Sequence, residues 1–205
     1  KRGAASLLAE ELRRAASEGH LARTIVLGSA ADPWQPLEAR ERVTRGLLQV
    51  LLEVGERTGS RGKGRTEAPR LVVLTRSPLI VRDLELLRGL HRVLPLRIAV
   101  ALPTLDPQLS RRLEPGAPDP ARRLEALQTL ARAGLVAGAL CEPVLPELTE
   151  STRDLRRIVC AARMAGARFL GARLLSLRGP ARGAFFGWLR RERPELKLFL
   201  REETS

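Results

Sequence analysis

Apolar residues along this chain alternate between short continuous runs and longer segments with a helical period. Between the runs, apolar side chains recur every three to four positions, as in amphipathic helices. Short continuous runs are typical of strands in a parallel sheet, because both faces of such a sheet are covered. The alternation predicts one α/β domain over residues 1–205, with parallel strands and right-handed crossovers. The predicted strands are Thr24–Leu27, Leu71–Leu74, Arg97–Leu102, Leu135–Leu140 and Phe169–Leu175.

Several of the predicted helices have recognisable ends. One helix is expected from about Glu38 to Val54. Another opens at Asp119-Pro120, which suits an N-cap followed by proline at the first helical position. Gly134 and Gly166 suit helix C-caps. Further helices are expected near residues 7–19, 81–94, 107–112, 151–165, 181–189 and 195–201.

Residues 55–69 interrupt this alternation. The segment, GERTGSRGKGRTEAP, has no apolar period and is rich in Gly, Arg and Lys. We interpret it as a flexible surface insertion. A glycine-rich phosphate-binding loop is the alternative, but the glycine spacing matches neither the dinucleotide-binding nor the P-loop pattern.

Small, polar and proline residues follow the predicted strands, most clearly in Gly28–Pro36. Ligands of α/β proteins bind at the carboxyl ends of parallel strands, where loops carry the chemistry and the strands hold the loops in place. Because the pattern recurs after all five predicted strands, the sequence predicts one binding mouth built from successive strand ends.

The charge balance raises the question of a nucleic-acid partner. The net charge is +13, and lysine contributes only Lys1, Lys63 and Lys197. Such an excess favours a polyanionic partner such as nucleic acid, although arginines spread over solvated helix surfaces by a coding bias are the interpretation we favour. Aromatic residues make up 3% of the chain, which argues against a base-stacking surface.

The two cysteines, Cys141 and Cys160, form neither a disulfide framework nor a C-x-x-C pair, and we expect both in the core.

No apolar run approaches the roughly 20 residues that span a bilayer. The N-terminal segment also lacks a secretion-type apolar core. We therefore expect no membrane partner and a cytoplasmic location.

Motifs at the strand ends occur in a fixed order along nearly the whole chain. This ordered set resembles the radical S-adenosylmethionine (SAM) superfamily, in the branch described as spore-photoproduct-lyase-like or "DNA repair photolyase". The motifs are Gly28–Glu38 with Val43-Thr44-Arg45, Thr75–Leu79 with Arg82-Asp83, Leu102–Asp106 with Arg112, Glu114-Pro115 with Arg122-Arg123-Leu124, and Glu142–Pro146.

The resemblance implies a partial (β/α)6 TIM-like barrel with a [4Fe-4S] cluster and SAM at its mouth. In the family, a C-x3-C-x2-C loop after the first strand binds the cluster. An electron donor protein then drives cleavage of SAM to a radical that abstracts hydrogen from the substrate. This chain lacks that loop, so as given it has no metal ligands of the family kind. We expect an N-terminally incomplete sequence with the first βα unit missing; a degenerate member that has lost the cluster is the alternative.

The resemblance also implies candidate cofactor-binding residues. Gly28 and Ser29 correspond to backbone that binds the methionine amino group of SAM, although Gly28 also suits an ordinary turn. Asp32 either caps its own turn or contacts the ligand. Arg76, next to Ser77, stands where relatives usually carry a lysine paired with the SAM carboxylate. Arginine keeps the charge, but its planar fork need not reproduce the geometry of that pair.

Three further positions depart from the pattern or leave alternatives open. Ala101 stands where relatives often carry serine, so Thr104 would have to supply the hydroxyl. Arg123 either reaches the mouth from its helix or is a solvated helix residue, and we favour the second. No catalytic residue is identified; Cys141, at a strand end, is a candidate hydrogen donor, but we favour a core thiol.

Two main functions follow from these expectations. The first is a radical SAM enzyme core, lyase-like, acting on a nucleic-acid substrate. The second is a cluster-less, non-catalytic module that binds nucleic acid or a protein partner. A barrel enzyme for a phosphate-bearing substrate is a third alternative.

Overall fold

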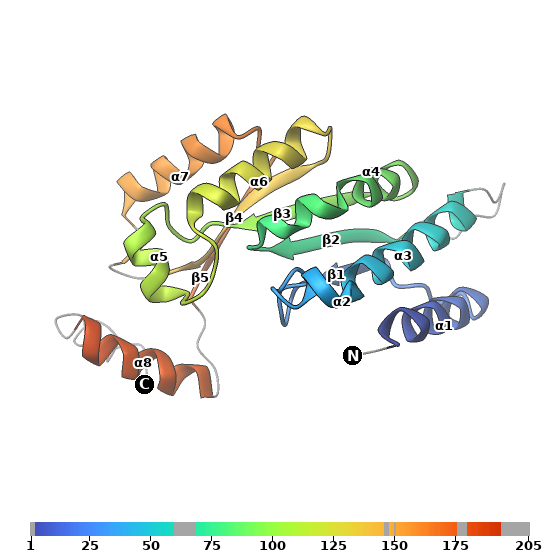
Figure 1. Cartoon of the computed structure of the whole chain (residues 1–205), viewed down its shortest axis with the longest axis horizontal. Helices are drawn as coiled ribbons and strands as arrows, with labels where there is room; N and C mark the ends of the chain where they lie inside the picture. Colours follow the sequence, from blue (N-terminus) through green and yellow to red (C-terminus); the bar gives the residue numbers. More distant parts are fainter. Residues whose placement is uncertain (1–2, 60–68, 146–147, 150, 176–179, 194–205) are drawn as a thin grey trace.

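The computed structural model contains one sheet of five parallel strands in the order β1-β2-β3-β4-β5 (Figure 1). It describes residues 3–59, 69–145, 148–149, 151–175 and 180–193. All four neighbouring pairs are parallel, which confirms the predicted α/β class. The carboxyl ends of the strands therefore lie at one edge of the sheet. The strands are β1 (Thr24–Leu27), β2 (Arg70–Thr75), β3 (Leu96–Ala101), β4 (Ala137–Val144) and β5 (Leu170–Leu174).

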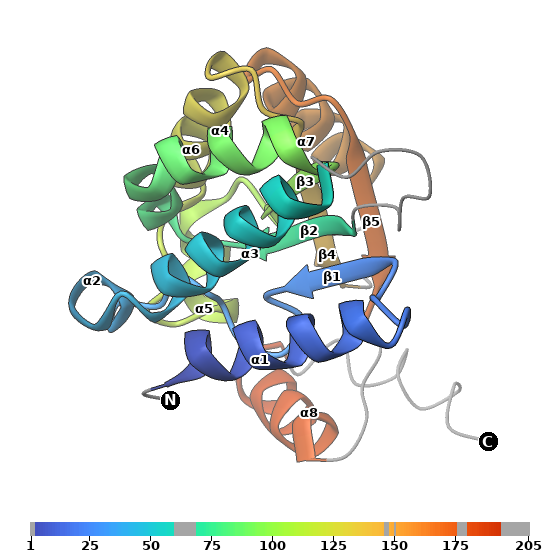
Figure 2. The ribbon, with the colours of Figure 1, turned by 90° about the vertical axis from the view of Figure 1, so that its right-hand side faces the viewer.

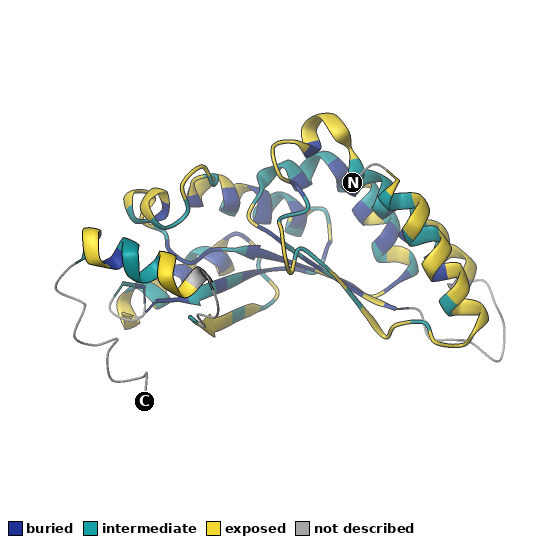
Figure 3. Cartoon of the chain, turned by 90° about the horizontal axis from the view of Figure 1, so that it is seen from below, coloured by how far each residue is buried: buried dark blue, intermediate teal, exposed yellow. Residues whose placement is uncertain are grey.

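Helices alternate with the strands and gather on one face of the sheet (Figure 1, Figure 3). Figure 2 shows α1 packed along α3, while α8 stands apart from this helical layer. The helices are α1 (Ala4–Ser17), α2 (Glu38–Glu41), α3 (Val43–Gly59), the 3-10 helix η1 (Pro78–Asp83), α4 (Leu84–Val93), α5 (Pro107–Leu113), α6 (Pro120–Arg132), α7 (Thr152–Met164) and α8 (Pro180–Glu192). The helix predicted near 195–201 lies outside the described residues.

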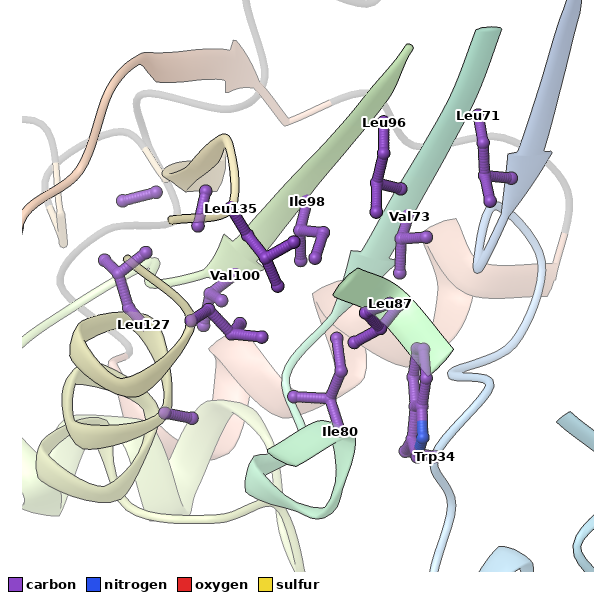
Figure 4. Close-up of a cluster of buried hydrophobic side chains, with 14 of the residues drawn as sticks. Trp34, Leu71, Val73, Ile80, Leu87, Leu96, Ile98, Val100, Leu127 and Leu135 are labelled. Atoms are coloured by element: carbon purple, nitrogen blue, oxygen red, sulfur yellow. The ribbon is translucent and has the colours of Figure 1, made fainter. Parts of the chain in front are cut away.

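The hydrophobic core lies between this helical layer and the sheet (Figure 4). Leu71 and Val73 of β2 point into the core and are buried, whereas Val72 and Leu74 are only half-buried. On the edge strand β1, Val26 is 44% exposed. The prediction that both faces of the β2 run are covered is therefore wrong for the described part of the chain, because helices cover one face only.

The helix predicted from Glu38 to Val54 is broken at Arg42, whose φ of 51° lies in the left-handed region. The break lets Glu38 fold back onto the start of α3. Its carboxylate accepts hydrogen bonds from the backbone N–H groups of Thr44 (3.0 Å) and Arg45 (3.2 Å). Since the first N–H groups of a helix have no partner within the helix, Glu38 acts as the N-terminal cap of α3.

Helix α3 extends further than the sequence suggested, to Gly59. The first five residues of the expected insertion 55–69 are thus helical, and residues 60–68 lie outside the described residues. Gly55 is buried in the packing of α3 on α4, and a Cβ atom there would come within 2.6 Å of Val93. The glycine permits a close helix approach, which its setting in a glycine-rich run concealed.

Strand β4 also runs past its predicted end at Leu140 and includes Glu142-Pro143-Val144. The register with β5 shifts between Cys141 and Val144. A proline cannot donate a ladder hydrogen bond, so it is tolerated at such an irregularity. The first three residues of the Glu142–Pro146 motif are therefore part of the sheet rather than a loop.

The structure confirms some of the other local predictions and contradicts others. Gly134 and Gly166 have φ values of 83° and 86° at helix ends, which confirms the C-cap assignment. Asp119 occupies the N-cap position of α6, but its side chain caps nothing and lies 3.4 Å from Arg111. Cys141 is buried as expected, whereas the prediction of a core Cys160 is wrong, because it is exposed on α7.

Candidate functional site

A pocket of about 280 Å³ opens at the carboxyl edge of the sheet, and residues from the ends of all five strands line it. We call it the mouth pocket. Its wall combines backbone, small side chains and charged groups of both signs. The lining residues are Gly28, Ser29, Ala30, Ala31, Asp32, Leu74, Thr75, Arg76, Ala101, Leu140, Glu142, Pro143 and Arg173.

Gly28 is required where β1 enters the mouth pocket. Its φ is 98°, and a Cβ atom would overlap the carbonyl oxygen of Leu74 at the end of β2. Only glycine accommodates both the left-handed backbone and this close approach. The chain thereby exposes backbone, rather than a side chain, at the first strand tip.

Asp32 joins the loop after β1 to the end of β2. One carboxylate oxygen accepts from the backbone N–H of Trp34 (2.9 Å) and from the hydroxyl of Thr75 (2.7 Å). The other accepts from the backbone N–H of Arg76 (2.7 Å). Asp32 thus caps its own turn, one of the two predicted roles, and also lines the mouth pocket.

A chain of charged contacts continues from Arg76 to the tip of β3. The Arg76 guanidinium lies 2.6 Å from Glu114, and the same carboxylate lies 2.7 Å from Arg123. Arg123 is fully buried and donates to the carbonyl oxygens of Pro118 (2.8 Å) and Ala101 (3.2 Å). The solvated placement that the sequence favours is wrong, because Arg123 is buried. Its guanidinium contacts the end of β3 at Ala101 but does not line the mouth pocket.

A second network of buried charge lies behind the β1 loop. Asp83 is fully buried and accepts from the indole N–H of Trp34 (2.8 Å), from Arg45 (2.6 Å) and from Arg82 (2.7 Å). Arg82 also donates to the Glu38 carboxylate (3.0 Å). Figure 4 shows the Trp34 ring at the edge of the apolar cluster, with its nitrogen turned away. These contacts fix the β1 loop against η1 and α3.

Burial alone would raise the pKa of the Asp83 carboxyl, since it penalises the charged form. Hydrogen bonds from Arg82, Trp34 and Arg45 outweigh that penalty, and the net pKa is lowered. The pKa of Arg82 is raised, chiefly by its hydrogen bond to Asp83. The pair therefore stays charged at neutral pH.

The opposite wall of the mouth pocket is simpler. Glu142 of β4 and Arg173 of β5 form an ion pair across the two strands. The Arg173 side chain is 72% exposed, and that of Glu142 is 23% exposed. Both residues line the pocket, but only the arginine has little surrounding protein.

The structure brings four of the seven predicted cofactor-binding residues to the mouth pocket: Gly28, Ser29, Asp32 and Arg76. Ser77 instead caps η1, accepting from the N–H of Leu79 (3.3 Å). Thr104 is buried, and its hydroxyl accepts from the N–H of Asp106 (3.0 Å). Thr104 therefore does not line the pocket beside Ala101.

Cys141 is 1% exposed, and burial raises the pKa of its thiol. It does not line the mouth pocket, although its neighbour Leu140 does. A buried, protonated thiol fits the core role favoured by the sequence.

Two further carboxylates received no site role from the sequence: Glu114, which pairs with Arg76, and Asp83, which lies behind the β1 loop. Glu114 and Asp83 both stand in the ordered motifs, each next to another distinctive residue. The sequence offered one sign that these residues form ion pairs: each is an acidic residue at a motif position in an arginine-rich chain. Their partners lie up to 49 positions away, as Trp34 does from Asp83, so the pairing could not be read from spacing.

Among the described residues, no group of three or more His, Cys, Asp or Glu side chains is placed to hold a metal ion. Within the same residues, no helix is both long enough and apolar enough to cross a bilayer.

Comparison with curated proteins finds relatives without an assigned function. An uncharacterized protein of Mycobacterium tuberculosis is 34% identical over 202 residues, which cover 98% of this chain and 55% of the relative. An uncharacterized protein of Methanocaldococcus jannaschii is 24% identical over 131 residues, covering 64% of this chain and 44% of that protein. The chain thus spans about half the length of the mycobacterial relative. No protein-family model matches the chain.

Several solved structures of other proteins share the fold of this chain. SuiB of Streptococcus suis superposes with a TM-score of 0.59 at 15% identity, over 92% of this chain and 41% of SuiB. A spore photoproduct lyase mutant gives a TM-score of 0.58 at 16% identity, over 92% of this chain and 51% of the lyase. At such identity the likeness establishes the fold: a parallel, partial-barrel α/β architecture shared with these two proteins.

Proposed function

We propose that this chain is the SAM-binding body of a radical SAM enzyme that acts on nucleic acid. The observation that carries the proposal is the convergence of all five strand tips on one pocket, which includes Gly28, Ser29, Asp32 and Arg76. A structure of SuiB contains SAM, and one of spore photoproduct lyase contains both AdoMet and a dinucleoside spore photoproduct. The shared fold supports placing the cofactor in the mouth pocket.

The residues of the mouth pocket fit an amino-acid cofactor of this kind. In our proposal the backbone at Gly28 and Ser29 binds the amino group, since no side chain intervenes at Gly28. Arg76 binds the carboxylate: Glu114 pairs with one of its nitrogens, and its side chain remains 47% exposed. A guanidinium suits this role because its planar fork offers several donors to one carboxylate.

Asp32 acts as a positioning residue in this proposal. Its carboxylate accepts all three of its observed hydrogen bonds from Trp34, Thr75 and Arg76. It thereby fixes the loop after β1 relative to the end of β2. Ser77, Thr104 and Arg123 were also predicted as cofactor ligands. Their observed contacts support a structural role for each instead.

SAM bound in such a site would supply a carbon radical, with methionine as the leaving group, if an electron donor outside the described residues reduced its sulfonium; that radical would abstract a hydrogen atom from the substrate. Cluster ligation does not fit the described residues: one cysteine is buried in β4, the other is exposed on α7, and no acidic or imidazole cluster replaces them. We therefore assign no cluster ligand to this chain. The task proposed for its own residues is to bind SAM, orient it along the strand tips and exclude water.

The nucleic-acid substrate rests on charge as well as on the fold. The chain carries a net charge of +13. Polyanions are attracted to such a surface by release of their counterions. The electron donor protein and the cytoplasmic location remain predictions of the resemblance and the sequence.

Isothermal titration calorimetry of the whole chain with SAM tests the proposal. Ala30 is exposed and lines the mouth pocket, so Ala30→Trp should fill it and raise the dissociation constant of SAM about tenfold or more. Ala39 is equally exposed on α2 but lies outside the pocket lining. Ala39→Trp is therefore the matched control and should bind SAM as the unaltered chain does.

Two results would contradict the proposal: no heat of binding for the unaltered chain, or equal SAM affinity in both tryptophan variants. The second candidate function, a cluster-less module for nucleic acid or a protein partner, is favoured by the separation of the two cysteines within the described residues. That candidate predicts binding of its partner without binding of SAM.

A further inference from the structure

A second hollow, of about 630 Å³, lies beside the mouth pocket. It is bounded by the loop after β1, the start of η1 and the loop between α5 and α6. Asp32 and Arg76 belong to the lining of both hollows, so they form the partition between them. We call this hollow the proline groove, because its lining includes Pro36, Pro78, Pro115 and Pro118.

The prolines give the groove rigid apolar walls. A pyrrolidine ring fixes its backbone φ and presents flat C–H surface without a backbone donor. Leu79 and Ala117 extend this surface, and both are half-buried before any ligand arrives. Since little conformational freedom remains to be lost on binding, such walls suit the face of a planar ring. A nucleobase stacks on apolar side chains in the same way.

The lining of the groove carries two guanidinium groups, Arg76 and Arg122, against two carboxylates. The buried Arg123 lies behind Glu114, and counting it leaves three guanidinium groups against two carboxylates, an excess of one positive charge. The two carboxylates are Asp32 and Glu114. Asp32 already accepts three hydrogen bonds, and Glu114 is paired with both Arg76 and the buried Arg123.

Arg122 takes no part in these ion pairs. It is exposed, lines the groove, and has no carboxylate partner among the described residues. A free guanidinium beside an apolar slot favours a ligand that joins a planar ring to an anion. The surrounding excess of positive charge, +13 for the chain, favours a polyanion over a single small acid.

We infer that the proline groove binds one nucleotide of single-stranded nucleic acid, with its base against the prolines and its phosphate at Arg122. The inference rests on the proposed function and sharpens it, because it assigns the substrate strand a place outside the mouth pocket. A strand held there passes the Asp32–Arg76 partition, so its neighbouring nucleotide is delivered to the mouth.

Fluorescence anisotropy of the whole chain with a labelled single-stranded DNA oligonucleotide, over a series of salt concentrations, tests this inference. Arg122→Glu should raise the dissociation constant about tenfold and reduce the slope of log affinity against log salt by about one. Arg156→Glu makes the same charge change at an exposed position on α7. As the matched control, it should change the dissociation constant less than about twofold.

A second variant tests the groove without changing charge. Ala117→Phe fills it and should weaken oligonucleotide binding about as much as Arg122→Glu does, while calorimetry shows unaltered SAM binding. The inference is overturned if the unaltered chain does not bind the oligonucleotide, if both glutamate variants weaken binding equally, or if Ala117→Phe binds normally. In each case retained SAM binding leaves the SAM-binding part of the proposed function standing, whereas absence of SAM binding by the unaltered chain contradicts the proposed function itself.

Discussion

The two halves of the mouth are built differently. On the β1–β3 side, Asp32, Asp83, Glu114 and Arg123 are each fixed by two or more partners, and the last three are largely withdrawn from solvent. On the β4–β5 side, one ion pair between Glu142 and Arg173 stands at the rim with the arginine largely exposed. One half is set before a ligand binds, while the other can rearrange around it.

The difference separates stability from binding. Buried charges that lose a partner destabilise a fold strongly, because the remaining charge stays desolvated. Exposed pairs contribute little to folding, since water already solvates both ions. Substitutions of the buried charges on the β1–β3 side should therefore lower the free energy of unfolding, whereas substitution of the exposed charge on the β4–β5 side should alter ligand affinity with little effect on stability.

The largest expected effect is at Asp83. Asp83→Ala removes the shared acceptor of Trp34, Arg45 and Arg82, and leaves two guanidinium groups and an indole N–H without it. We expect the free energy of unfolding, measured by urea denaturation, to fall by about 3–5 kcal/mol. Asp119→Ala is the control: that carboxylate is 51% exposed with one arginine at 3.4 Å, and its loss should cost at most about 1 kcal/mol. Equal losses in the two variants would show that the Asp83 network does not hold the β1 loop.

Arg123 should come next. Arg123→Ala leaves the carbonyl oxygens of Ala101 and Pro118 without this donor, while Glu114 keeps Arg76. A loss of about 2–4 kcal/mol in the free energy of unfolding is expected. Its neighbour Arg122 is exposed, so Arg122→Ala should change stability by no more than about 0.5 kcal/mol. An unchanged free energy of unfolding in Arg123→Ala would mean that the rim does not depend on the buried contacts of Arg123.

The lowered pKa of Asp83 gives a smaller, pH-dependent effect. A carboxyl whose folded pKa is depressed stabilises the fold above its unfolded pKa of about 3.9, and this contribution is lost as the pH falls through the folded pKa. Thermal unfolding between about pH 5 and pH 2 should therefore show a steeper loss of stability in the unaltered chain than in Asp83→Asn. Parallel curves would assign the acid sensitivity to other carboxylates.

The sequence predicted the fold better than the rim. The approximate strand positions and their parallel orientation followed from five apolar runs, since alternation with helices leaves few topologies. The break at Arg42 was missed because its cause, the Glu38 carboxylate, acts on Thr44 and Arg45 only after the chain has turned back. Cys160 was misplaced because a helical period alone does not say which face meets the sheet.

The site was predicted at the level of strand tips but not of side chains. Gly28 and Arg76 follow their strands directly, so their positions were fixed by the sheet. Thr104 lies in the loop between β3 and α5, and Arg123 lies in α6. The direction of each side chain follows from a hydrogen bond, from the Asp106 N–H to Thr104 and from Arg123 to the Ala101 carbonyl oxygen. No spacing rule encodes such choices, because each depends on contacts between distant segments.

The smallest effect on stability is expected on the opposite wall, at Arg173. Because its side chain is 72% exposed, Arg173→Ala should change the free energy of unfolding by no more than about 0.5–1 kcal/mol. The same variant removes a charge from the mouth pocket, so calorimetry should show a severalfold change in SAM affinity. Arg168→Ala, exposed just before β5 and outside the pocket lining, should alter neither quantity. If Arg173→Ala destabilised the chain as much as Arg123→Ala does, the two walls would be equally fixed, and the division between a preset half and a ligand-responsive half would be wrong.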